Sequence, residues 1–134
     1  MRTAILFSCL LGIATGCASG DKKFQQGEYE GVADRESIRE IVRQRIPELE
    51  VCYEQAIDQM PGAEGKLTLD WDLVADGTVE NLKVAKADKK IQGAVPCVLA
   101  KVKTWRFPKP PEGEVMAVTY PFCFSENGKI CMTK

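Results

Sequence analysis

The sequence predicts an α+β domain in which two helices pack on one face of a small antiparallel sheet of three to four strands. Two segments carry apolar residues at helical spacing, and two others alternate strictly between apolar and polar residues. An Asp-Gly pair follows the first alternating segment, as in a tight hairpin. The order is helix, strand, strand, helix, strand and a short tail, and it favours two helices covering one sheet face.

The first helix is expected to begin with Ser37 as its N-cap, because Glu40 follows three residues later, as in a capping box. Pro47 lacks the N–H that would bond the carbonyl of Arg43, so we expect a kink or a break there. Apolar residues recur mostly at steps of three and four and mark one buried face. They are Ile38, Ile41, Val42, Ile46, Leu49, Tyr53, Ala56, Ile57 and Met60.

A β-hairpin is expected after this helix. Residues 67–73 alternate between apolar and polar side chains, which predicts a strand with one buried and one solvated face. Asp76-Gly77 is a strong hairpin signal. The step of three between Val79 and Leu82 breaks the alternation of the return strand and predicts a bulge near Glu80–Asn81.

The second helix is expected over about 88–104, with its regular part beginning near Val95, because a glycine and Pro96 weaken its start. A proline-rich connector then leads to a last strand at 115–124, which again alternates. Pro121 has no N–H to donate to a ladder. At least one side of this strand is therefore expected to be an edge or a bulge.

Residues 1–16 are expected to be a lipoprotein signal peptide. Arg2 precedes an apolar run, Ala4–Ala14, which is too short to cross a bilayer and ends in small residues before Cys17. This resembles the bacterial lipoprotein signal, in which a peptidase cuts before a cysteine that carries a lipid, although Ala14 stands where a leucine is usual. Ordinary secretory cleavage is the alternative. Cys17 is the expected lipidation site and the attachment to the membrane.

The expected tether covers residues 17–35, which are polar and contain glycine without any period. The folded domain then covers 36–134 and ends in a hairpin. If Cys9 leaves with the signal peptide and Cys17 is lipidated, four of the six cysteines remain and can pair completely. Complete pairing suits an oxidising compartment.

The cysteines are expected to form two structural disulfides. Cys52 lies on the first helix and Cys97 on the second, so a bridge can form where the helices approach closely. Cys123 and Cys131 flank a turn. A three-residue loop at 126–128 sets them opposite each other, whereas a two-residue turn at 127–128 sets Cys123 opposite Met132. Thiol chemistry or zinc is the alternative, but the sequence contains no Cys-x-x-Cys.

Several function classes are disfavoured by composition. The chain contains no histidine, which excludes Ser-His-Asp and Cys-His catalysis and histidine metal sites. It has no glycine-rich phosphate loop and no basic cluster, so we expect no cofactor and no nucleic acid partner. Asp70, Asp72 and Asp76 lack calcium-loop spacing. An enzyme that uses paired carboxylates as acid and base is the alternative to a non-enzymatic module. The acidic residues, however, form no recognisable catalytic arrangement in the sequence.

Four segments together resemble the AgmX/PglI C-terminal domain of gliding bacteria, which is similar to the C-terminal domain of TonB. The resemblance covers about residues 36–125. Its distinctive marks are Cys52, Cys97 and the "YPF" strand. The segments are "IVRQRIPELEVCYEQAI" (41–57), the Asp-Gly hairpin, "VPCVLAKVKTWRFPKPPEGE" (95–114) and "VTYPFCF" (118–124).

The resemblance implies a non-enzymatic envelope lipoprotein that binds protein, in motility or other envelope complexes. A purely structural envelope lipoprotein without a specific partner site is the alternative. TonB proteins have a membrane-spanning N-terminal helix, whereas this chain begins with a short signal, so energy transduction is not expected. Ala18 replaces the aspartate that retains lipoproteins at the inner membrane of enteric bacteria, so we expect a lipid anchor in the outer membrane, facing the periplasm.

Trp105, Arg106 and Phe107 are candidate partner contacts, because tryptophan and arginine are enriched at binding hot spots. Packing of the helix end on the core is the other interpretation and the favoured one. TonB-like domains capture an extended peptide on the edge of their last strand. Here the tail is expected to fold back and close that edge, while a frayed tail that leaves the edge open is the alternative.

Overall fold

The computed structural model describes residues 31–132. The expected signal peptide (1–16), Cys17 and most of the expected tether (17–35) lie outside the described residues.

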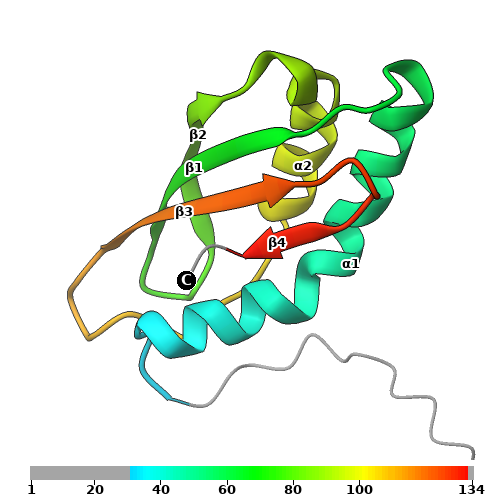
Figure 1. Ribbon diagram of the computed structural model, residues 1–134. Coiled ribbons are helices and arrows are strands. Elements are labelled where there is room, and N and C mark those ends of the chain that lie inside the picture. The colour runs from blue at the N-terminus through cyan, green and yellow to red at the C-terminus, as the bar shows by residue number, and fades with distance from the viewer. Residues whose placement is uncertain (1–30, 133–134) are drawn as a thin grey trace, which may run out of the picture.

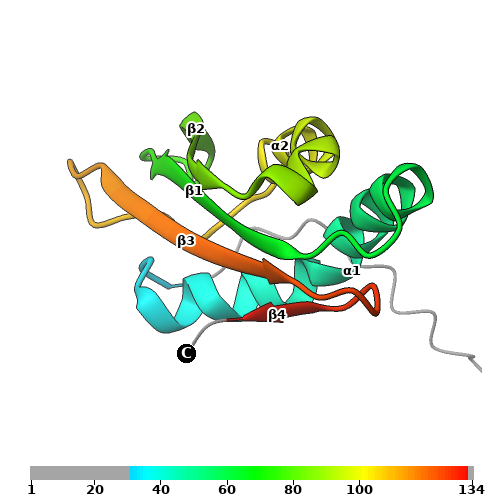
Figure 2. The same cartoon turned by 45° about the horizontal axis from the view of Figure 1, so that its top comes forward.

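The four strands form one antiparallel sheet in the order β2-β1-β3-β4, and both helices cover the same face of it (Figures 1 and 2). This confirms the expected α+β fold class with two helices on a small antiparallel sheet. The elements are α1 (Arg35–Gln59), β1 (Gly65–Leu73), β2 (Val79–Ala87), a 3₁₀ helix η1 (Lys89–Ala94), α2 (Val95–Val102), β3 (Met116–Phe124) and β4 (Ile130–Met132).

The capping box at the start of α1 involves Asp34 rather than Glu40. The Asp34 carboxylate accepts from the backbone N–H of Ser37 at 2.7 Å, and the Ser37 hydroxyl accepts from the backbone N–H of Asp34 at 2.9 Å. The expectation of an N-cap at Ser37 is therefore wrong. The carboxylate of Asp34 satisfies the orphan N–H of Ser37, so the helix begins before Ser37.

Pro47 lies inside α1 and does not end it. Figure 1 shows that the helix axis changes direction near its middle, as expected where the carbonyl of Arg43 loses its helical donor. Because of this bend, the N-terminal half of α1 lies beside β3, while the C-terminal half carries Cys52 to α2.

β1 pairs without interruption with β3, from Gly65↔Phe124 to Leu73↔Met116. Its pairing with β2 shifts register twice. One shift places Asn81 and Leu82 opposite a single residue of β1, and Asn81 has a φ of 50°. This confirms the expected bulge near Glu80–Asn81.

The core lies between the helices and one face of the sheet. Every second residue of β1 from Leu67 to Leu73 is buried, and so is every second residue of β3 from Val118 to Phe124. The helices add Val42, Leu49, Tyr53, Val98 and Val102. The opposite face of the sheet is partly or fully exposed, so it has no covering layer within residues 31–132.

Candidate functional site

The structure brings both expected cysteine pairs to disulfide distance. The Cα atoms of Cys52 and Cys97 are 5.6 Å apart and connect α1 with α2. Those of Cys123 and Cys131 are 5.0 Å apart and connect β3 with β4. The second pair has the register that the three-residue loop sets. The backbone N–H of Ser125 donates to the carbonyl of Lys129, and Gly128 has a φ of 79°.

The candidate partner contacts at the end of α2 differ in exposure. Trp105 and Phe107 are buried in the core, and only Arg106 is exposed. The indole N–H of Trp105 donates to Glu48 at 3.0 Å, and the same carboxylate pairs with Arg45. These contacts fix the connector to α1, so the two aromatic side chains stabilise the fold and are not available to a partner.

The sheet has two outer edges, and the edge at β2 is poorly suited to a further strand. Two register shifts interrupt β2, and bulges twist an edge away from regular pairing. Lys83 and Lys86 are exposed along it, and lysines on an edge strand oppose sheet extension. A groove of about 540 Å³ beside β2 is lined by both Glu80 and Lys103, so its lining contains charges of both signs.

The outer edge of β3 is regular, and its backbone directions follow from the ladder. In an antiparallel pair, hydrogen-bonded and non-hydrogen-bonded positions alternate. Ser125 bonds Lys129 across the turn, so Cys123, Thr119 and Ala117 also direct their N–H and C=O groups away from β1. Pro121 shares this direction and lacks only the donor, which explains how β3 accommodates a proline.

β4 covers only the end of this edge. Its described pairing consists of Phe122↔Met132, Cys123↔Cys131 and Phe124↔Ile130. The tail therefore closes the edge of the last strand only in part. Within residues 31–132, Ala117 and Thr119 pair with β1 on one side, and no backbone pairs with them on the side away from β1.

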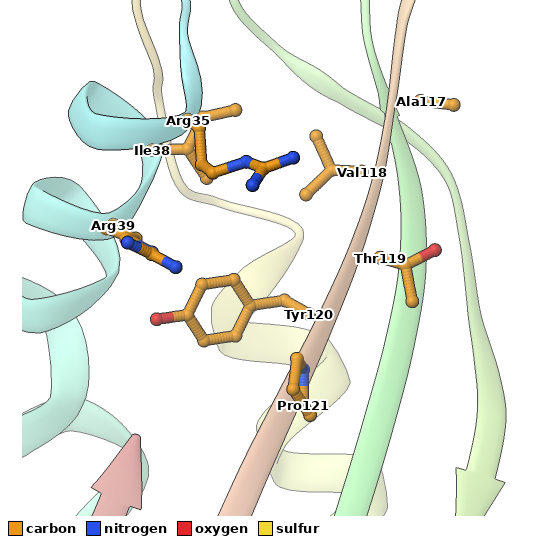
Figure 3. A pocket seen from close by; sticks show the side chains of 8 residues that line it. All are labelled: Arg35, Ile38, Arg39, Ala117, Val118, Thr119, Tyr120 and Pro121. Atoms are coloured by element: carbon orange, nitrogen blue, oxygen red, sulfur yellow. The ribbon is translucent and has the colours of Figure 1, made fainter. Parts of the chain in front are cut away.

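A groove of about 380 Å³ runs beside this open part of β3. Arg35, Ile38 and Arg39 line it from α1, and residues 117–121 line it from β3. Figure 3 shows the guanidinium groups of Arg35 and Arg39 and the ring of Tyr120 extending into the space between α1 and β3. The side chains of Ala117 and Thr119 point away from it. Sequence patterns did not indicate Arg35 and Arg39, because they belong to the polar part of an amphipathic helix.

The electrostatics of the groove are set by these arginines. Burial raises the pKa of the Tyr120 phenol above 10.0, and the nearby charges of Arg39 and Arg43 oppose that rise. Arg43 is paired with Glu40 at 2.5 Å, and Arg39 lies 3.9 Å from Glu36. The groove itself has two cationic lining residues and no acidic one.

No group of histidine, cysteine or acidic residues that could hold a metal ion occurs among the described residues. In the same part of the chain, no helix is long and apolar enough to cross a membrane.

No protein-family model matches this chain, and no curated protein matches it. Among solved structures, the chain is similar to the NMR solution structure of the C-terminal domain of Helicobacter pylori TonB. The two are 22% identical, and the alignment covers 72% of this chain and 96% of that chain with a TM-score of 0.38.

Proposed function

We propose that this chain is a non-enzymatic protein-binding module that captures an extended segment of a partner on the outer edge of β3. The observation that supports the proposal most directly is the open backbone edge at Ala117 and Thr119, which directs donors and acceptors away from β1 beside a groove. An added strand would satisfy these groups, as in other cases of strand addition to a sheet edge.

The magnitude of the backbone contribution indicates how such capture would work. Ala117 and Thr119 offer two N–H and two C=O groups, and each hydrogen bond contributes about 0.5–1.5 kcal/mol net. The sum, roughly 2–6 kcal/mol, is comparable with the cost of association alone. Backbone pairing therefore orients the segment, and side chains that enter the groove supply the affinity and the selectivity.

The module is proposed to act in the bacterial envelope as a lipoprotein. We expect Cys17 to carry the lipid, the outer membrane to hold the anchor and the domain to face the periplasm. A role in motility or in another envelope complex follows from the resemblance to the AgmX/PglI C-terminal domain. A purely structural lipoprotein without a partner site remains the competing proposal, and it requires no open edge.

The proposal is tested by removing the one backbone donor at Thr119. Thr119→Pro removes the outward N–H, and Pro121 already occupies an equivalent position in the same strand. Thr119→Ala is the matched control, because it also loses the hydroxyl contact to Asp70 at 2.8 Å but keeps the N–H.

The readout is photo-crosslinking in cells from a probe placed at Ala117, with a second probe at the exposed Ala85 of β2 for comparison. We expect a discrete partner crosslink from Ala117 only. It should persist with Thr119→Ala and disappear with Thr119→Pro. Equal crosslinking from both positions, or a crosslink that survives Thr119→Pro, would contradict strand capture and favour the structural alternative.

A further inference from the structure

We propose that the groove beside β3 selects extended partner segments that carry acidic side chains on the face toward α1. This inference rests on the proposed strand capture and adds the chemistry of the captured segment. It is carried by the position and charge of Arg35 and Arg39 along the open edge.

The lining of the groove carries positive charge only. Arg35 and Arg39 are its charged members, and the others are Ile38 and residues 117–121, which are uncharged. Glu36 and Glu40, the neighbouring carboxylates of α1, do not line it. An acidic segment in this groove would therefore meet two cations without meeting an anion.

The two arginines are available to such a segment. Arg35 is exposed, and its side chain makes no ion pair or hydrogen bond with any residue of 31–132. Arg39 lies 3.9 Å from Glu36, and the two side chains are 42% and 74% exposed. An ion pair that exposed contributes about 0–1 kcal/mol, so a ligand carboxylate can replace it at little cost.

The geometry of strand addition determines which side chains of the segment meet these arginines. Successive side chains of a strand point to opposite faces of the sheet. Residues of the segment that lie on the face of Val118 and Tyr120 would point toward α1, into the groove of Figure 3. Residues on the face of Ala117 and Thr119 would point to solvent. Selection for acidic side chains should therefore act on every second residue.

Arginine is well suited to this selection. Its planar guanidinium group can bind a carboxylate through two parallel hydrogen bonds, which a lysine cannot do. Ile38 and Val118 provide apolar surface beside the guanidinium groups for the methylene groups of the ligand side chain. A glutamate-bearing extended segment of another protein is the occupant that fits this combination.

The experiment uses three short, capped peptides in which valine alternates with glutamate, glutamine or lysine. Each is titrated into the protein with both disulfides intact, and the backbone amide signals of Ala117 and Thr119 are followed by NMR. We expect the glutamate peptide to bind about tenfold more tightly than the glutamine peptide. The lysine peptide should bind most weakly. The preference should shrink at high salt, because these charges are exposed.

The matched variants change net charge equally. Arg35→Gln with Arg39→Gln should abolish the preference for glutamate, whereas Lys89→Gln with Lys101→Gln, two lysines that do not line the groove, should keep it. Equal binding of the glutamate and glutamine peptides, with loss of both in Thr119→Pro, would overturn the charge selection and leave strand capture intact. Failure of all three peptides to bind would overturn both proposals.

One further outcome concerns the chain itself, because Glu28 and Glu30 precede the described residues. Tighter binding of the glutamine peptide after Glu28→Gln with Glu30→Gln would mean that these residues compete for the groove. The selected segment would then belong to this chain, and selection of an acidic segment from another protein would be overturned.

Discussion

Tyr53 is fully buried against the ring of Phe124, and its hydroxyl group has no hydrogen-bond partner among residues 31–132. A buried polar group without a partner costs about 1–3 kcal/mol. Tyr53→Phe removes that group while keeping the ring. We expect the free energy of unfolding in urea to stay the same or to rise by about 1 kcal/mol.

Tyr53→Ala is the control for packing, since it also removes the ring and should lower the free energy of unfolding by about 3–5 kcal/mol. If Tyr53→Phe itself lost more than about 1 kcal/mol, the hydroxyl group would have to be bound, and the local packing described for α1 and β3 would be wrong.

The same residue predicts a dependence of stability on alkaline pH. Burial, with smaller contributions from Glu64 and Glu126, raises the pKa of Tyr53 above 10.0. Above pH 10 the unfolded chain therefore loses the phenolic proton while the folded chain keeps it, and stability falls with rising pH. Thermal unfolding of wild type and Tyr53→Phe should diverge above that pH in favour of the variant. Parallel curves would contradict a raised pKa.

At the residue scale, the sequence predicted the burial of side chains better where the apolar residues recur with a regular period. The alternation in β1 and β3 identified the buried residues correctly. The N-cap was assigned to Ser37 instead of Asp34, because aspartate and serine are both good N-caps and only the backbone path selects between them. Packing of Trp105 and Phe107 on the core was the favoured expectation over partner contact, and both side chains are buried.

β4 is the least supported element of the fold. It pairs with β3 over three residue pairs, and its attachment depends strongly on the link between Cys123 and Cys131. Cys131 is exposed whereas Cys52 is 1% exposed. A mild dithiol reductant should therefore open the link to β4 first. Backbone amide exchange at Ile130–Met132 should then accelerate, while β1 stays protected.

Peptide mapping under non-reducing conditions provides the check on that experiment. It should find Cys52 joined to Cys97 and Cys123 joined to Cys131 before reduction, with only the second link lost afterwards. A link from Cys52 to either cysteine of the hairpin would contradict the placement of α1, and fast exchange at β4 before reduction would mean that the tail never covers β3.

The two links should also differ in their effect on stability. By chain entropy, the loop closed between Cys52 and Cys97 contributes about 4 kcal/mol, and the shorter loop between Cys123 and Cys131 about 2.5 kcal/mol. Urea unfolding of the paired alanine variants should show losses in that order. A larger loss from the hairpin pair would mean that β4 supports the core more than its three residue pairs indicate.

At the scale of elements, the fold class and the order of elements could be predicted because each has its own period in the sequence. The extent of β4 could not, since the number of residues that a tail pairs depends on the small difference between pairing and fraying. The groove beside β3 also depends on the bend at Pro47, whose presence the sequence predicted without its direction.

At the scale of the whole molecule, the proposed lipid anchor makes a separate prediction. Cys17→Ser should release the protein from the membrane fraction, and its mass should lack the acyl chains. Cys9→Ser, in the expected signal peptide, is the control and should leave the protein membrane-bound. An unlipidated wild-type protein that begins at Ser19 or Asp21 would contradict the anchor without affecting the groove.

The open edge of β3 is the central claim, and backbone amide exchange of the free, oxidised protein tests it most directly. Val118 and Tyr120 direct their N–H groups toward β1 and should exchange slowly, as should Cys123 under β4. Ala117 and Thr119 should exchange fast, and a bound segment should slow them. Slow exchange at Ala117 and Thr119 in the free protein would show that the edge is already occupied and would contradict the account.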